Sequence, residues 1–377
     1  MNKSLLICLL IGFISVFFVG LYIGTFENFS SNSLDMIINN SDSSDKTELN
    51  PVISKFNSNT IVQIQNESDI KKIRDELIFY IWNEPPSVIF PSENLSKIIP
   101  VAKKNFLDKR FENLDNIKSI EKLSIEMKHG VNSIVYIFHA EKSNNELIIY
   151  HQGHSGGFIN GKSTINYFLN NGYSVMAFSM PLMGMNNQPI INVENIGTMK
   201  FFEHEQFKFL ESEHFSPLNY FFTPINLSIN YLDLNYNFNN YHMIGISGGG
   251  WTTTIYPALD TRISKSFAVS GSLPIPLRIN PQDIGDYEQL IPDFYNIANY
   301  LELYVMSSYG PNREFVQIFN KFDPCCFSGT LFENYQEKLQ NKLSELNNGK
   351  FSVILDDTHN EHKISEHALE LILKKIQ

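Results

Sequence analysis

Two spacings of apolar residues alternate along most of the chain and predict its secondary structure. Short apolar runs predict buried strands at 147–150, 173–178, 241–246, 266–270, 315–319 and 351–355. Between them, helical spacing predicts helices over 163–170, 251–259, 335–346 and from about 365. Short strands that alternate with helices are typical of a mostly parallel sheet with helices on both faces. The pattern therefore predicts an α/β fold.

Two further segments precede this alternation. Apolar residues recur at helical intervals over 61–83, and Pro85 follows, which predicts one amphipathic helix that ends there. The stretch 117–140 alternates apolar and polar residues on both sides of Gly130, which predicts an antiparallel hairpin. We expect the helix to pack beside the main sheet.

The N-terminal part of the chain has a different pattern. Leu5–Phe26 is a run of 22 residues without a formal charge, and about 20 helical residues span a bilayer core. Lys3 precedes the run and acidic residues follow it, so we expect an uncleaved single-pass anchor with the rest of the chain outside the cytoplasm. The alternative is a cleaved signal peptide and a secreted product, although no clear Ala-x-Ala site follows.

These patterns divide the chain into four parts. The prediction is a transmembrane signal-anchor at 1–27, a disordered Ser/Asn-rich tether at 28–60, an N-terminal helical region at 61–116, and an α/β domain at 117–377 with a cap at about 182–235. The tether has too little apolar surface to offset the entropy lost on ordering. The α/β domain is large enough to bury a core of its own.

Charge and cysteine content exclude several classes of protein. With 40 acidic against 29 basic side chains the net charge is −11, and no basic cluster offsets it, so we expect no nucleic-acid partner. Three cysteines cannot form a disulfide framework or a four-thiolate zinc site. The adjacent pair Cys325 and Cys326 could form a vicinal disulfide, but we favour two small buried thiols.

The chemistry is concentrated where the strand 241–246 ends. Here Gly245, Ser247 and Gly249 match G-x-S-x-G between a predicted strand and a predicted helix. A serine on such a sharp turn needs very small residues two positions before and after it, because the chain folds closely past itself. Ser247 is therefore the candidate nucleophile, and the two glycines are the residues that permit the turn.

A serine nucleophile needs a general base and a carboxylate that orients the base. Asp323 follows the strand 315–319 and is the candidate acid. His362 lies between the last strand and the last helix and is the preferred base, with His359 in the same loop as the alternative. Both histidines lie beyond the same strand end, so the sequence leaves the choice between them open.

The developing oxyanion needs backbone donors that already point at it. One is the N–H of Gly248, which follows the nucleophile, and the other should come from the loop after an earlier strand. That loop is HQGHSGG, from His151 to Gly157. We assign the second donor to the main-chain N–H of His154.

The order of these motifs resembles the α/β-hydrolase superfamily over about 117–377, with similarity to serine esterases and dienelactone-hydrolase-like members. The resemblance implies an eight-stranded, mostly parallel sheet and a Ser-Asp-His triad that acts through an acyl-enzyme. In one respect the sequence departs from the family's common pattern, because Gln152 separates His151 from Gly153 where many members have His-Gly. This difference concerns the second oxyanion donor.

Other motifs are expected to be structural. His204 and His214 lie in an acidic, aromatic segment, and no metal-binding motif is complete there, so we expect no metal and a solvated or lid segment. The GKST at Gly161 lacks the upstream glycine of a phosphate-binding loop. No cofactor is predicted.

The sequence thus predicts a membrane-anchored serine hydrolase that cleaves carboxylic esters, with a small-molecule or acylated substrate and the membrane as its partners. One alternative is a serine peptidase of the same fold. Another is a non-catalytic surface binding protein on a hydrolase scaffold. Fold class alone does not determine the substrate.

Overall fold

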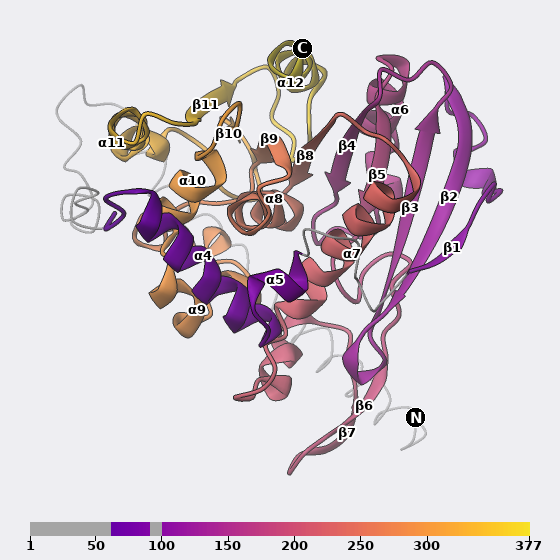
Figure 1. Cartoon of the computed structure of the whole chain (residues 1–377), viewed down its shortest axis with the longest axis horizontal. Helices are drawn as coiled ribbons and strands as arrows, with labels where there is room; N and C mark the ends of the chain where they lie inside the picture. The colour runs from indigo at the N-terminus through magenta and orange to yellow at the C-terminus, as the bar shows by residue number, and fades with distance from the viewer. Residues whose placement is uncertain (1–61, 91–99) are drawn as a thin grey trace, which may run out of the picture. The chain divides into compact units, whose positions relative to one another are not determined.

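A nine-stranded mixed sheet forms the centre of the computed structural model, which describes residues 62–90 and 100–377 (Figure 1). Its strand order is β1-β2-β3-β5-β4-β8-β9-β10-β11. The strands are β1 Val101–Lys103, β2 Ile117–Glu126, β3 Asn132–Ala140, β4 Glu146–His151, β5 Ser174–Phe178, β8 Asn240–Ile246, β9 Ile263–Val269, β10 Glu314–Asn320 and β11 Lys350–Asp356. The six strands from β5 to β11 in this order are parallel, and β1, β2 and β3 extend the sheet through antiparallel pairs. The predicted α/β class is confirmed.

The expected number of eight strands is wrong, because the sheet has nine. The additional strand is the edge strand β1. This strand pairs with β2 and lies inside 61–116, the region expected to be helical. All three of its residues are exposed. Such a short exposed strand lacks the apolar alternation by which a strand is found in a sequence.

Helices cover both faces of the sheet (Figure 1). They are α4 Glu67–Trp82, α5 Pro86–Ile89, α6 Lys162–Asn170, α7 Asn219–Asn235, α8 Gly248–Leu259, α9 Pro292–Ile297, α10 Tyr300–Ser308, α11 Gln336–Glu345 and α12 Glu366–Ile376. Because side chains alternate along a strand, Ile148 of β4 packs with α6 and α12, whereas Leu147 and Ile149 pack with α4, α7, α8, α10 and α11. The sheet is therefore buried on both faces, as its apolar strands predict.

The hairpin and the first helix follow their sequence patterns closely. β2 pairs antiparallel with β3 across a turn that contains His129 and Gly130, as predicted. The first helix begins later than expected, because Asn66 caps α4 through a hydrogen bond from the N–H of Asp69. An Asn at this position satisfies a backbone donor that the helix leaves unpaired.

The segment 182–235 contains a small hairpin and a core helix. The hairpin consists of β6 Ile190–Val193 and β7 Gly197–Lys200, and a 3₁₀ segment, His204–Leu210, follows it. α7 begins at Asn219 and buries much of its length against β3 and α8. The expected cap thus includes a helix that belongs to the core.

The parallel strands end together at one edge of the sheet. In the pairing register, Gly245 of β8 lies opposite His151 of β4, and Ile246 lies opposite Val269 of β9. Asn320 of β10 lies opposite Asp356 of β11. The loops that follow β4, β8, β9, β10 and β11 therefore leave the same edge, where open α/β sheets bind their ligands.

The segments predicted to form a membrane anchor, 1–27, and a tether, 28–60, lie outside the described residues. Among residues 62–90 and 100–377, no helix has both the length and the apolar character needed to cross a bilayer.

Candidate active site

Ser247 lies at a sharp turn between β8 and α8. Its backbone has φ 57° and ψ −126°, a conformation that a residue with a side chain adopts only under strain. A Cβ on Gly245 would lie 2.1 Å from the carbonyl oxygen of Gly249, and one on Gly249 would lie 2.1 Å from that of His151. The chain can make this turn only because both positions are glycine, and the turn projects the serine from the edge of the sheet.

The loop after β4 passes directly beside this turn. A Cβ on Gly153 would lie 2.6 Å from the Cβ of Ser247 and 3.2 Å from the backbone nitrogen of Gly248. Gly248 is the first residue of α8, and the first N–H groups of a helix have no partner within the helix. The loop and the helix start therefore bring backbone donors together next to the serine hydroxyl.

Gln152 is held so that its own N–H points away from this group of donors. That N–H donates to the carbonyl oxygen of Phe178 at 3.0 Å, and the Tyr150 hydroxyl donates to the Gln152 side chain. Within the described part of the chain, no acceptor takes the N–H of His154. The Gly153 N–H likewise has no acceptor among the described residues, so the N–H groups of Gly153 and His154 are both free in this loop.

Asp323, in the loop after β10, and His362, in the loop after β11, form a hydrogen-bonded pair at the same edge of the sheet. Nδ1 of His362 lies 2.8 Å from Oδ2 of Asp323. The carboxylate also accepts from the Ser270 hydroxyl at 3.0 Å and from the Cys325 N–H at 2.9 Å. Burial alone would raise the pKa of Asp323, but these hydrogen bonds outweigh it and lower that pKa.

This pair is connected to the serine turn through β9. The N–H of Ser247 donates to the carbonyl oxygen of Val269 at 2.9 Å, and the next residue, Ser270, donates to Asp323. Nε2 of His362 is buried and has no partner among the described residues. The pair thus presents an unengaged imidazole nitrogen at the edge where Ser247 lies.

Solved structures of known proteins share the fold of this chain. Acetyl xylan esterase 1 from a Thermoanaerobacterium species is similar with a TM-score of 0.55 and 13% identity, over 88% of this chain and 98% of that one. An acetyl xylan esterase from Paenibacillus sp. R4 gives 0.55 and 15% identity, over 84% and 96%. The chain has the α/β-hydrolase fold. No protein-family model and no curated protein sequence matches it.

His359, the alternative base, has partners of its own in this α/β-hydrolase fold. Its Nδ1 accepts from the N–H of Glu361 at 3.1 Å, and its Nε2 lies 3.4 Å from Oδ2 of Asp356 but makes no hydrogen bond among the described residues. Asp356 also accepts from the Ser365 hydroxyl. The structure therefore pairs Asp323 with His362 and pairs His359 with a different carboxylate.

The expectation of two buried thiols at Cys325 and Cys326 is wrong. The two residues form a vicinal disulfide, with Cys325 exposed and Cys326 half-buried. They lie on the loop that follows β10, directly after the candidate acid, and this loop runs over the surface. A loop carries too few apolar contacts to bury two thiols.

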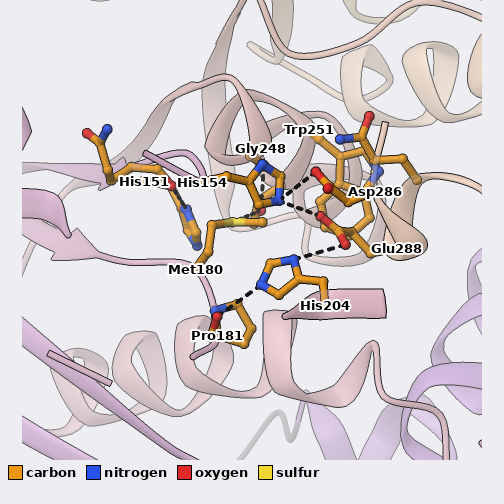
Figure 2. Close-up of polar contacts among 12 residues, drawn as sticks. His151, His154, Met180, Pro181, His204, Gly248, Trp251, Asp286 and Glu288 are labelled. Carbon is orange, nitrogen blue, oxygen red and sulfur yellow. Dashed lines mark hydrogen bonds and ion pairs between the residues drawn. The ribbon is translucent and has the colours of Figure 1, made fainter. Parts of the chain in front are cut away.

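A second group of polar side chains lies beside the oxyanion loop (Figure 2). Nε2 of His154 lies 2.9 Å from Glu288 Oε1 and 3.1 Å from Asp286 Oδ2. Nδ1 of His204 lies 3.1 Å from Glu288 Oε2, and its Nε2 lies 2.9 Å from the carbonyl oxygen of Pro181. Of the expected solvated or lid segment, the solvated alternative is wrong at His204, because its side chain is only 2% exposed and has partners on both nitrogens.

Electrostatics in this group favour charged side chains. Burial alone would raise the pKa of Glu288, but the charge of His204 and the hydrogen bond from His154 outweigh burial and hold that pKa well below its usual range. Burial likewise lowers the pKa of His154, and the hydrogen bond to Glu288 and its charge more than reverse this effect, so that the pKa is raised.

Sequence reasoning missed Glu288, Asp286 and Ser270. The first two lie between β9 and α9, in a loop without apolar periodicity, and there is no motif around them. Their polar surroundings are typical of a solvated loop, although Glu288 is fully buried. No local signal distinguishes such a carboxylate from a surface one, because its partners come from segments far away in the sequence.

A large hollow on the surface lies away from Ser247. A hollow of about 1010 Å³ lies between α4 and the segment 211–216, and Ser247 does not line it. The chemistry described above identifies the candidate site better than the size of a hollow, because only the sheet edge brings together a strained serine, free backbone donors and an imidazole–carboxylate pair.

Proposed function

We propose that the protein is a serine hydrolase that cleaves carboxylic esters through an acyl-enzyme. Ser247 is the nucleophile, His362 is the general base and Asp323 orients it. The N–H groups of Gly248 and His154 stabilise the oxyanion. Each of these roles corresponds to one element of the Ser-His-Asp mechanism on this fold.

The reaction proceeds in two halves. His362 Nε2 takes the proton of the Ser247 hydroxyl while the oxygen attacks the ester carbonyl carbon, and the two N–H groups bind the resulting oxyanion. The tetrahedral intermediate collapses, and His362 returns the proton to the departing alcohol. A water molecule, deprotonated by the same imidazole, then attacks the acyl carbon. As the bond from this carbon to Ser247 Oγ breaks, His362 returns the proton to the serine oxygen and the carboxylic acid leaves.

The observation that carries this proposal is the state of the His362 ring. Its Nδ1 lies 2.8 Å from Asp323 Oδ2, which fixes the tautomer with the proton on Nδ1. Nε2 is then a lone-pair acceptor, and it is the ring nitrogen that has no partner. A buried acceptor without a partner is costly, and a serine hydroxyl or a substrate-bound water would satisfy it.

We further propose acetyl and other short-chain esters as the substrate class. Both solved structures named above are called acetyl xylan esterases, and this name supports a short acyl group. Initial rates on p-nitrophenyl acetate, butyrate and laurate, with aminoacyl p-nitroanilides beside them, would compare acyl length and test the peptidase alternative. A preference for the anilides would contradict the proposal.

Labelling by a fluorophosphonate probe tests the nucleophile directly. The wild-type chain should be labelled, and Ser247→Ala should not be, while its circular dichroism remains unchanged. Ser228→Ala is a matched control, because Ser228 is a fully buried serine in α7 whose hydroxyl has no hydrogen-bond partner. Labelling that persists in Ser247→Ala, or no labelling and no ester turnover in the wild type, would favour a binding protein instead.

The location of the enzyme is a separate proposal. We infer from the uncharged run Leu5–Phe26 that the chain is anchored in a membrane, with 28–60 as a tether and the catalytic domain outside the cytoplasm. Retention in the membrane fraction after a carbonate wash, at unprocessed mass, is the expected result. A shortened soluble product would instead indicate a cleaved signal peptide.

A further inference from the structure

Four side chains from three parts of the chain point at one another at the loop 151–157 (Figure 2). They are His154, His204, Asp286 and Glu288, which we call the two-histidine cluster. One ligand atom from each of His154, His204 and Glu288 lies within 4.8 Å of the others. Asp286 Oδ2 completes the group at 3.1 Å from His154 Nε2.

The hydrogen bond between His204 and Pro181 determines which nitrogen of the His204 ring carries a proton. The Pro181 carbonyl oxygen can only accept, so His204 Nε2 must carry a proton. In a neutral ring Nδ1 then has a lone pair, which faces Glu288 Oε2 at 3.1 Å. Two lone pairs in such contact repel each other, so this position requires a cation, either a proton or a metal ion.

The same need arises at His154. Its Nε2 faces two carboxylate oxygens, from Glu288 at 2.9 Å and from Asp286 at 3.1 Å. A proton on Nε2 meets this need with a neutral His154 ring, whereas His204 would need a proton on each nitrogen and hence a full positive charge in a side chain that is only 2% exposed. Burial of a charge is costly even when the charge is paired.

We propose that the two-histidine cluster binds one divalent transition-metal ion of the zinc type. Two imidazole nitrogens and two carboxylate oxygens form a ligand set that suits Zn²⁺ in a four-coordinate structural site. One such ion balances the two carboxylates while both rings remain neutral. The Pro181 carbonyl, which accepts from the non-ligating nitrogen of His204, is the outer partner that metal-bound histidines usually have.

One of the proposed ligands is exposed to solvent and the others are more deeply buried, so an ion can reach the cluster from solvent. The Glu288 side chain is 0% exposed, whereas that of Asp286 is 47% exposed. An ion would therefore meet Asp286 first and then the buried ligands. Since protein groups fill four positions, the metal has a structural role: it fastens His154, and with it the oxyanion loop, to the segment 286–288 and to His204.

This binding does not depend on the proposed esterase activity, so the test measures metal. The full-length chain is stripped with a chelator, incubated with Zn²⁺, passed through a desalting column, and analysed for metal content and for thermal unfolding. We expect about one Zn²⁺ per chain and a higher unfolding temperature with the metal, as binding to the folded state requires. The Ser247→Ala variant should give the same result.

Variants locate the ion. Glu288→Gln, which keeps the shape of the side chain, and His204→Ala should retain no Zn²⁺ after desalting and should show no thermal shift. His139→Ala is the matched control, because His139 also lies near a buried glutamate, with Nε2 3.4 Å from Glu121 Oε2, outside the cluster. It should bind Zn²⁺ as the wild type does.

Two results would overturn the proposal. One is a wild-type chain that retains no Zn²⁺, Co²⁺ or Ni²⁺ and shows no thermal shift with any of them, since protons alone would then fill the cluster. The other is equal retention of Zn²⁺ by Glu288→Gln and the wild type. If a variant fails to fold, the absorption spectrum of the Co²⁺-loaded wild type decides, because a four-coordinate site gives an intense visible band and a six-coordinate surface site does not.

Discussion

The imidazole of His154 lies in the space that a side chain on Gly248 would need. A Cβ on Gly248 would be 2.4 Å from Cε1 of that ring and 2.7 Å from its Nδ1. The two residues that we propose as oxyanion donors therefore also pack against each other. The position of one backbone donor depends on the packing of the other residue, and Glu288 holds the ring in place from the far side.

Gly248→Ala should therefore impair catalysis more than it impairs folding. The new methyl group would displace the His154 ring, and with it the loop whose N–H we propose as a donor. Loss of one oxyanion donor costs a factor of about 100 to 1,000 in kcat, and we expect a loss of that size on p-nitrophenyl acetate. Gly197→Ala is the control for a destabilising change away from the site: a Cβ there meets nothing within 4 Å, but φ 109° disfavours any side chain, so stability should fall while kcat stays unchanged. A Gly248→Ala enzyme with nearly full activity would contradict this account.

The strained backbone of Ser247 gives a prediction about stability. Ser247→Ala and Ser247→Gly both remove the hydroxyl, but only glycine adopts φ 57° without a steric cost. Strain at one such residue costs roughly 1–3 kcal/mol, partly offset by the greater freedom of glycine in the unfolded chain. We expect Ser247→Gly to exceed Ser247→Ala by about 1 kcal/mol in the free energy of unfolding, measured in urea. Equal stabilities would show that the turn is not strained.

Local sequence predicted the parts of the site that are built from one segment. The turn at Ser247 could be found because its two glycines, the preceding apolar strand and the following helix are neighbours in the chain. Asp323 and Ser365, the latter as the cap of the last helix, could be placed for the same reason: each directly follows or precedes a clearly periodic element.

Features that depend on distant segments could not be predicted in this way. The acidic, aromatic sequence around His204 predicts a solvated or lid segment, yet the side chain is buried against Pro181 and Glu288. The edge strand β1 has no apolar residue that packs into the core. In both cases tertiary contacts determine the environment of the residue, and the local sequence pattern does not indicate these contacts.

The choice between His362 and His359 as the general base gives a prediction in which each variant is the control for the other. His362→Ala should reduce kcat by a factor of about 10⁴ or more, since removal of the base disables the triad. His359→Ala should have a much smaller effect on kcat, because His359 pairs with Asp356 and the Glu361 N–H. Its main effect should be on thermal stability. A greater loss of kcat in His359→Ala than in His362→Ala would reverse the assignment of the base.

The environment of Asp323 predicts how stability depends on pH. Its pKa is lowered from the ordinary value of 3.8, because hydrogen bonds from His362, Cys325 and Ser270 outweigh burial. A carboxyl with a lowered pKa in the folded state stabilises the protein fully above its unfolded pKa, and this contribution is lost as the pH falls through the folded pKa.

Asp323→Asn should therefore be less stable than the wild type near neutral pH, and the difference in free energy of unfolding should shrink between about pH 5 and about pH 3. Urea unfolding at several pH values measures it. Asp357→Asn serves as the control, because Asp357 is an exposed carboxylate in a nearby loop and reports the effect of removing one acidic charge. The difference in free energy of unfolding between Asp323→Asn and the wild type could instead stay constant or grow as the pH falls. These hydrogen bonds would then not hold the carboxylate in its charged form. His362 would in that case lack the partner that fixes its tautomer.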